Sequence, residues 1–137
     1  LRHDEKQRYN FSFSGLKTSV RYFLRDHPRL AEDPQKLRDL CASVQTAIVE
    51  VLVAKTLRAA KRLRVKCVTA SGGVTCNRAL RAALAAKCQN HGLALRLAEP
   101  ALCTDNAAMI GILAERKLAS GLRSAMDVEI DPTASLA

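Results

Sequence analysis

The chain reads VTASGGVTCN at residues 68–77, where a predicted strand gives way to a predicted helix. Residues 66–70 are short and β-prone, and two glycines then turn the chain. Because glycine has no Cβ, Gly72 and Gly73 can adopt positive φ and let a ligand approach the backbone closely. A helix is predicted from about residue 77 to residue 90, and the unpaired amides at its start would favour an anion.

Two roles fit Asn77, the residue at which this helix is expected to begin. Its side chain can cap the helix, or it can exchange hydrogen bonds with a ribose or a base. The glycine spacing is neither that of a phosphate-binding P-loop nor the G-x-G-x-x-G of dinucleotide-binding proteins. Spacing alone therefore favours an ordinary strand-to-helix turn with Asn77 as its N-cap.

Upstream of this junction the sequence predicts a strand and two helices. Residues 9–14 alternate apolar and polar side chains, which predicts a half-buried strand. A short helix is predicted over 16–24, before Pro28. Asp33 and Pro34 then form a good helix start, with apolar residues at helical spacing to about residue 63.

Downstream, a second strand is predicted over 93–98 and a last helix over 107–119, followed by a poorly patterned tail at 123–137. Strands that are separated by helices favour parallel pairing. The expected fold is therefore α/β and helix-rich, with a small, mostly parallel sheet and a single partial domain over 1–137.

A second polar cluster, Cys103-Thr104-Asp105-Asn106, follows the strand predicted over 93–98. Ligands of open parallel sheets collect beyond the carboxyl ends of the strands. Asp105 can bind a metal there or cap the next helix, and the residues alone favour the cap. The three histidines of the chain are not spaced to join Asp105 in a metal site, so further ligands would have to come from outside this chain.

The chain is strongly basic, with a net charge of +9 from 22 Lys and Arg residues against 13 Asp and Glu residues. Such an excess on 137 residues fits a polyanionic partner such as RNA. The alternative is a solubilising surface, because the charges are spread along several helices and are dense only over residues 58–66. Charge alone favours nucleic acid only slightly.

The five cysteines are odd in number and never form a C-x-x-C pair, which predicts reduced structural thiols in the cytoplasm. No stretch of about 18 uncharged apolar residues is present, and residues 1–6 lack the apolar segment of a signal peptide. We therefore expect a cytoplasmic protein without a membrane span. The first residue is not Met, which predicts that the chain was cut from a longer protein.

Four blocks occur along the chain in a fixed order: FSFSGLKT at 11–18, ASVQ at 42–45, SGGVTCNR at 71–78 and LCTDNAAMI at 102–110. In sequence and order these blocks resemble the tRNA N6-adenosine threonylcarbamoyltransferase family, formerly called O-sialoglycoprotein endopeptidases. The resemblance spans about residues 10–122. It implies the two-lobed fold shared by actin, Hsp70 and sugar kinases, with this chain as the later part of the second lobe.

The resemblance also implies a reaction. The family transfers the threonylcarbamoyl group from threonylcarbamoyl-AMP to the N6 amine of the adenosine 3′ to the tRNA anticodon. Gly72, Gly73 and Asn77 match the motif that holds the adenylate, and Asp105 matches the aspartate ligand of a divalent metal, iron or zinc. The implied partners are threonylcarbamoyl-AMP, tRNA and the other subunits of the threonylcarbamoyladenosine machinery.

The chain departs from the family pattern in several places. The paired metal-binding histidines, H-x-x-x-H, belong to the first lobe and do not occur here. Thr75 and Cys76 stand where small residues are usual, and Ser71 where Ala is common. No catalytic residue is assigned, and the chain alone is expected to be inactive. Apolar surface that stays exposed on this chain would favour self-association.

Two other functions remain open at this point. The first is a non-catalytic module that binds RNA or a protein through its basic helices. The second is the peptidase activity of the older family name, for which the sequence offers neither an activated nucleophile nor a complete metal-hydrolase motif.

Overall fold

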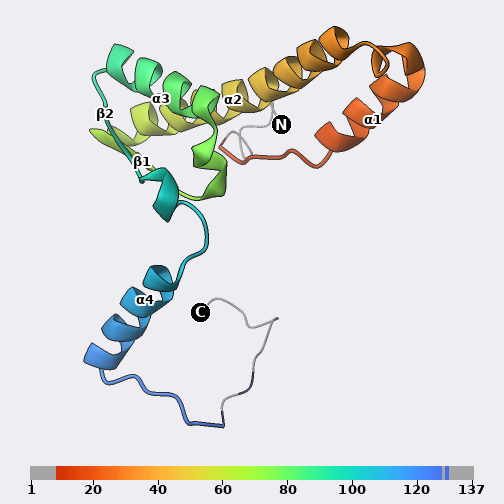
Figure 1. Ribbon diagram of the computed structural model, residues 1–137. Helices are drawn as coiled ribbons and strands as arrows, with labels where there is room; N and C mark the ends of the chain where they lie inside the picture. The colour runs from red at the N-terminus through yellow and green to blue at the C-terminus, as the bar shows by residue number, and fades with distance from the viewer. Residues whose placement is uncertain (1–8, 128, 130–137) are drawn as a thin grey trace. The chain divides into compact units, whose positions relative to one another are not determined.

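The computed structural model describes residues 9–127 and 129, and the chain divides into two compact units, Leu1–Cys103 and Thr104–Ala137 (Figure 1). The first unit contains helices α1 (Leu16–Asp26), α2 (Pro34–Leu63) and α3 (Arg78–Asn90), strands β1 (Cys67–Ala70) and β2 (Ala94–Leu97), and three short 3-10 helices, η2 (Pro28–Leu30), η3 (Gly73–Cys76) and η4 (Pro100–Leu102). The second contains α4 (Ala107–Ala119). Most of the predicted tail at 123–137 lies outside the described residues.

The longest helix, α2, begins as its sequence predicts. The Asp33 carboxylate accepts hydrogen bonds from the amides of Gln35 at 2.9 Å and Lys36 at 3.2 Å, and Pro34 occupies the first helical position. The amides of Lys36 and Gln35 lower the pKa of Asp33, because they stabilise its charged form. The helix ends at Leu63, and its C-cap, Arg64, adopts the left-handed conformation with φ of 53°.

The two strands pair in parallel, as predicted, with Cys67 opposite Ala94 and Ala70 opposite Leu97. Alternate side chains of β1 point into the core, so that Val68 is buried while Cys67 and Thr69 are exposed. Among the described residues the sheet contains these two strands. The observed architecture is therefore α/β and helix-rich.

The core lies where α2, α3 and the two strands meet (Figure 1). Its buried residues belong to two adjoining clusters: Val53, Leu80 and Leu84, and Ala60, Val68 and Cys88. Leu, Val and Ala predominate, because the chain has few aromatic residues. Burial raises the pKa of the Cys88 thiol, and the neighbouring Cys67 adds to the increase.

The strand predicted over 9–14 is absent, and this prediction was wrong. Residues 10–13 have no regular secondary structure, and α1 begins at Leu16 after a turn at 14–15. Alternating residues form a strand only if a neighbouring strand accepts the backbone hydrogen bonds, and none lies beside this segment in the described structure. Instead, the carbonyl of Asn10 accepts a hydrogen bond from the ammonium of Lys55, a buried residue of α2.

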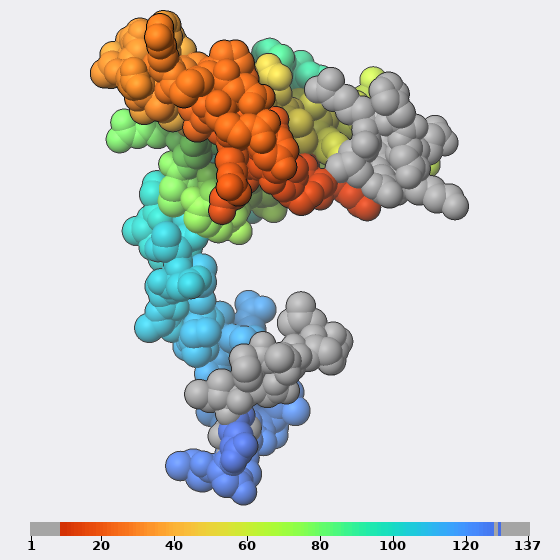
Figure 2. Space-filling view, turned by 90° about the vertical axis from the view of Figure 1, so that its right-hand side faces the viewer, coloured from red at the N-terminus to blue at the C-terminus, as the bar shows by residue number. Residues whose placement is uncertain are grey.

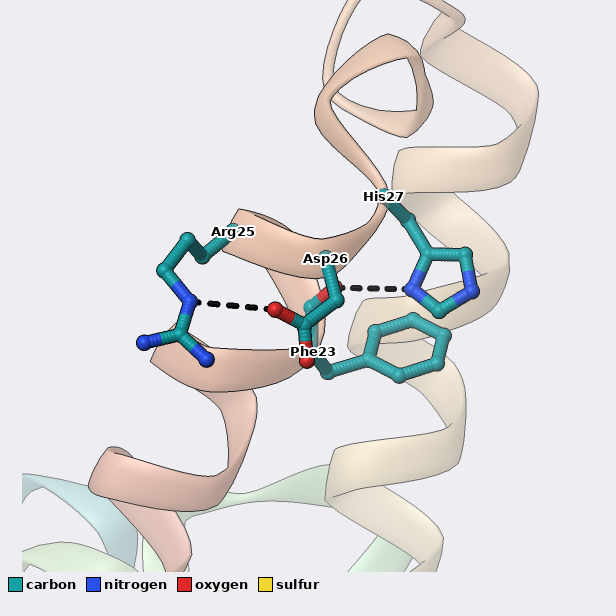
Figure 3. Close-up of polar contacts among 4 residues, drawn as sticks. All are labelled: Phe23, Arg25, Asp26 and His27. Atoms are coloured by element: carbon teal, nitrogen blue, oxygen red, sulfur yellow. Dashed lines mark hydrogen bonds and ion pairs between the residues drawn. The ribbon is translucent and has the colours of Figure 1, made fainter.

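Helix α1 lies on the surface of the first unit and has no buried residue (Figure 2). It runs two residues beyond the predicted end and stops before Pro28, as the proline requires. At its C-terminus the His27 ring stacks on Phe23 with centroids 4.4 Å apart, and its Nδ1 lies 2.9 Å from the Phe23 carbonyl oxygen (Figure 3). These contacts close the last turn of the helix.

By length and composition, α2 is also apolar enough to cross a membrane. The core helices of soluble proteins can have the same length and composition, so this property does not by itself indicate a membrane span. Two charged residues, Glu50 and Lys55, lie within the apolar stretch of the helix. The buried residues of the helix are Val53, Lys55 and Ala60, and Val53 and Ala60 belong to the core with α3 and the strands, so core packing accounts for part of its apolar character.

Candidate functional site

The diglycine turn follows β1 directly. Gly72 has φ of 89°, a conformation that favours glycine, whereas Gly73 does not have positive φ. The chain then forms η3, which the sequence analysis did not predict. The Thr75 amide and hydroxyl both donate to the Gly72 carbonyl, at 2.9 and 2.7 Å. The turn is therefore held by hydrogen bonds that close within four residues.

The space beside both glycines is open. A Cβ atom built on Gly72 or on Gly73 would meet no atom within 4 Å. Internal packing therefore does not require a glycine at position 73, where the backbone conformation also suits other residues. The open backbone at Gly73 is accessible to an external group.

Asn77 is the N-cap of α3, as the spacing predicted. Its Oδ1 accepts the Leu80 amide at 3.0 Å, and its Nδ2 donates to Oε1 of Gln45 on α2 at 2.8 Å. The cap hydrogen bond shows which atom of the Asn77 side-chain amide is the oxygen, because only the oxygen can accept it. One N–H group and one lone pair of Asn77 remain for a ligand.

A cavity of about 440 Å³ adjoins Asn77. Its polar lining residues are Gln45 and Asn77, and its apolar walls come from α1, α2, η3 and α3, including Val20, Val44, Ile48, Val74 and Leu80. An apolar cavity with a few convergent polar groups is typical of sites for small organic ligands. The sequence did not reveal the Gln45 contact, because 32 residues separate it from Asn77.

Arg81 on α3 joins the loops that follow the two strands. Its Nε donates to the Thr75 carbonyl and one terminal nitrogen donates to the Ala98 carbonyl, both at 2.6 Å. The same terminal nitrogen lies 3.6 Å from the sulfur of Cys103. A planar guanidinium offers separate nitrogens in a fixed fork to the two carbonyls, whereas an ammonium offers a single nitrogen. Arg81 therefore fixes the diglycine turn relative to the end of β2.

We expect Arg81→Lys to destabilise the first unit by about 1 kcal/mol, because the lysine reaches one of the two carbonyls and leaves the other without its charged donor. Urea unfolding followed by circular dichroism measures this change. The matched control is Arg78→Lys, an exposed arginine at the start of the same helix. Equal stability of the two variants would show that Arg81 does not hold the loops together.

Cys103 lies at the same junction and is 2% exposed. Its sulfur is 3.3 Å from the Thr75 hydroxyl oxygen. The hydrogen bond from Thr75 lowers the pKa of Cys103, the Arg81 guanidinium and the Cys76 thiol add to the decrease, and burial opposes it. The ends of β1 and β2 are thus side by side, with a polar network between the loops that leave them.

Asp105 belongs to the second unit. The expectation from the residues alone, that it caps the following helix, was wrong: the N-cap of α4 is Asn106, whose Oδ1 accepts the Met109 amide at 3.2 Å. Asp and Asn are equally good caps, so the sequence could not decide between neighbours. Asp105 lies two residues after Cys103, and its proximity to Gly73 stays a prediction.

The described residues do not contain a complete set of metal donors. Across residues 9–127 and 129, no three or more His, Cys, Asp or Glu side chains gather into a metal-binding group. The carboxylate of Asp105 is a suitable single ligand for iron or zinc. All five cysteines are free, and Cys41, Cys67 and Cys76 are exposed.

Comparison with known proteins places these residues in a family. Residues 2–112 match the family described as tRNA N6-adenosine threonylcarbamoyltransferase. Proteins of that name from Geobacter metallireducens and Geotalea uraniireducens are 44% and 42% identical to the chain over 94% and 96% of its length. The protein of that name from Chlorobaculum tepidum is 48% identical over 82% of the chain.

The chain spans about one third of the length of these curated relatives: 37% of the Geobacter metallireducens protein, 38% of the Geotalea uraniireducens protein and 32% of the Chlorobaculum tepidum protein. The matched region includes the diglycine turn, Asn77 and Asp105. The four sequence blocks and this match agree. The chain therefore belongs to the tRNA N6-adenosine threonylcarbamoyltransferase family.

Proposed function

We propose that the chain supplies part of an enzyme that transfers the threonylcarbamoyl group from threonylcarbamoyl-AMP to the N6 amine of the adenosine 3′ to a tRNA anticodon. The main support for this function is the family match over residues 2–112, a region that contains both the diglycine turn and Asp105. The complete enzyme would work in the cytoplasm, with tRNA as substrate and with the other subunits of the threonylcarbamoyladenosine machinery. This chain by itself would not catalyse transfer.

Gly72, Gly73 and Asn77 would hold the adenylate. Three observations support this role: the open space beside both glycines, the unused hydrogen-bonding capacity of Asn77, and the apolar cavity next to it. Its volume of about 440 Å³ lies within the range of small-molecule sites. The base would enter the apolar cavity while the phosphate meets the glycine backbone.

Asp105 would contribute one carboxylate ligand to a divalent metal, iron or zinc. The family match over residues 2–112, which includes Asp105, supports this role. When bound, a metal there would act as a Lewis acid toward the carbamoyl carbonyl. The remaining ligands would come from the lobe that this chain lacks.

The proposed architecture is the second lobe of the fold shared by actin, Hsp70 and sugar kinases. A parallel pair of strands is too small to form an independent sheet. One face of this pair, with Cys67, Thr69, Ala94 and Arg96, is exposed in the described structure, whereas parallel sheets are normally covered on both faces. Additional strands and helices of a complete lobe would cover that face. Without them, exposed apolar residues such as Leu63 and Val74 would favour self-association.

A chimera tests the proposed function. The matched C-terminal region of the Geobacter metallireducens relative is replaced by this chain, and threonylcarbamoyl transfer to tRNA is measured. We expect activity within about 10-fold of the parent, because the chain is 44% identical to that relative over 94% of its own length. A chimera that folds and binds metal but transfers nothing would reject the assignment.

Gly73→Ala separates ligand binding from folding. We expect stability to change by less than about 0.5 kcal/mol, since the backbone conformation is ordinary and the added Cβ meets no atom. The affinity of the chimera for AMP should fall several-fold, because the methyl group occupies the approach to the backbone. Calorimetric titration measures the affinity, with Gly111→Ala within α4 as control. Unaltered AMP binding would remove Gly73 from the nucleotide site.

The second candidate is a non-catalytic module that binds RNA. Its support is the net charge of +9 and the dense basic segment at the end of α2, where the exposed side chains include Arg58, Lys61, Arg62 and Arg64. Such a module would bind RNA with steep salt dependence and would not bind AMP. AMP binding that depends on Gly73 favours the transferase.

A further inference from the structure

Two cysteine residues lie at the junction of the strand-end loops. Cys76 ends η3 and is exposed, whereas Cys103 follows η4 and is buried. One oxygen atom contacts both residues: the Pro100 carbonyl accepts the backbone amide of Cys103 at 3.1 Å and lies 3.8 Å from the sulfur of Cys76. The two residues, which are far apart in the sequence, are therefore neighbours in the first unit.

The adjoining side chains hold the two loops in this arrangement. The Thr75 hydroxyl oxygen lies 3.3 Å from the Cys103 sulfur, and Thr75 immediately precedes Cys76. Arg81 closes the group by bonding the carbonyls of Thr75 and Ala98. Thr75 and Arg81 thus contact the sulfur of Cys103, while the Pro100 carbonyl contacts that of Cys76.

We propose that Cys76 and Cys103 form a reversible disulfide bond when the protein meets a small-molecule disulfide such as oxidised glutathione. The exposed sulfur of Cys76 attacks one sulfur of the oxidant, which forms a mixed disulfide and releases one glutathione thiol. The sulfur of Cys103 then attacks the Cys76 sulfur and releases the second glutathione thiol. Two protein thiols are oxidised, one glutathione disulfide is reduced, and the two thiol protons pass to the released glutathione.

The exposure of the two residues suits this sequence of steps. The oxidant needs to reach only Cys76, because the second step is intramolecular. The resulting bond would join the loop after β1 to the loop after β2, the same segments that Arg81 links through hydrogen bonds. Oxidation would thereby fix the diglycine turn covalently to the end of β2.

The test uses the whole chain. The reduced protein is equilibrated with oxidised and reduced glutathione, free thiols are alkylated, and the intact mass is measured. We expect a species lighter by two hydrogens that carries alkyl groups on the other three cysteines. Trypsin should then release peptide 67–78 linked to peptide 97–116, and fragmentation of the linked pair should assign the bond to Cys76 rather than to Cys67.

Two variants sharpen the result. Cys76→Ser should abolish the linked peptides, whereas Cys67→Ser, an exposed cysteine on the same peptide, should leave them unchanged. Stable glutathione on Cys76, a bond between Cys67 and Cys88, or links only between separate molecules would each overturn the proposal. Fragmentation of the unsubstituted protein decides the question even if a variant fails to fold.

Discussion

Asp105→Ala in the chimera is expected to reduce threonylcarbamoyl transfer by at least about 100-fold, because replacing residues that merely orient metal ligands already costs about 10- to 100-fold in affinity or activity. The carboxylate would be one of few protein ligands, and an alanine offers no donor atom in its place. Transfer to tRNA is measured together with the metal content of the purified protein. Both should fall, while the circular dichroism spectrum stays that of the parent.

The matched control is Asp127→Ala, which removes an exposed carboxylate from the same unit. Transfer and metal content should both be unaffected by this change. Asn106 caps α4, so the loss of Asp105 leaves the helix start intact. If Asp105→Ala retains full turnover and full metal content, Asp105 has no part in the site.

Asn77→Ser in the chimera is expected to weaken AMP binding by about 30-fold while changing stability by only a few tenths of a kcal/mol. Serine is as good an N-cap as asparagine, so α3 keeps its first hydrogen bond. The shorter side chain cannot reach a ligand, and the loss of the two hydrogen bonds that the remaining N–H group and lone pair of Asn77 would make to AMP, about 1 kcal/mol each, accounts for the weaker binding. Calorimetric titration with AMP measures the dissociation constant.

Two further variants show whether the weaker AMP binding is due to Asn77 itself. Gln45→Ala removes only the partner of the Asn77 amide, and we expect a loss of affinity smaller than that of Asn77→Ser. Asn90→Ser, at the other end of α3, should bind AMP like the parent. If Asn77→Ser binds AMP as tightly as the parent does, Asn77 is a helix cap and nothing more.

The sequence predicted the parts of the fold that depend on local interactions. Asp33 and Pro34 predicted the start of α2, and the helical spacing of its apolar residues predicted its end. The parallel pairing of β1 and β2 followed from the helix between them. The glycines at the strand-to-helix junction located the turn, although the 3-10 helix after it was missed.

What the sequence could not predict depends on contacts between distant residues. The segment 9–14 has the alternation of a strand, but pairing needs a neighbour that alternation does not reveal. Gln45 and Arg81 reach Asn77, Thr75 and Ala98 only because the helices pack as they do. Cys76 and Cys103 are 27 positions apart in the sequence, and no spacing rule relates them.

The most direct measurement is a crystal structure of the chimera with AMP and the metal bound. We predict that the phosphate of AMP lies against the backbone at Gly72 and Gly73, with Asn77 hydrogen-bonded to the nucleotide. A metal should lie about 2.0–2.2 Å from a carboxylate oxygen of Asp105, in the same cleft. A nucleotide bound elsewhere, or Gly73 and Asp105 on opposite faces of the molecule, would contradict the proposed site.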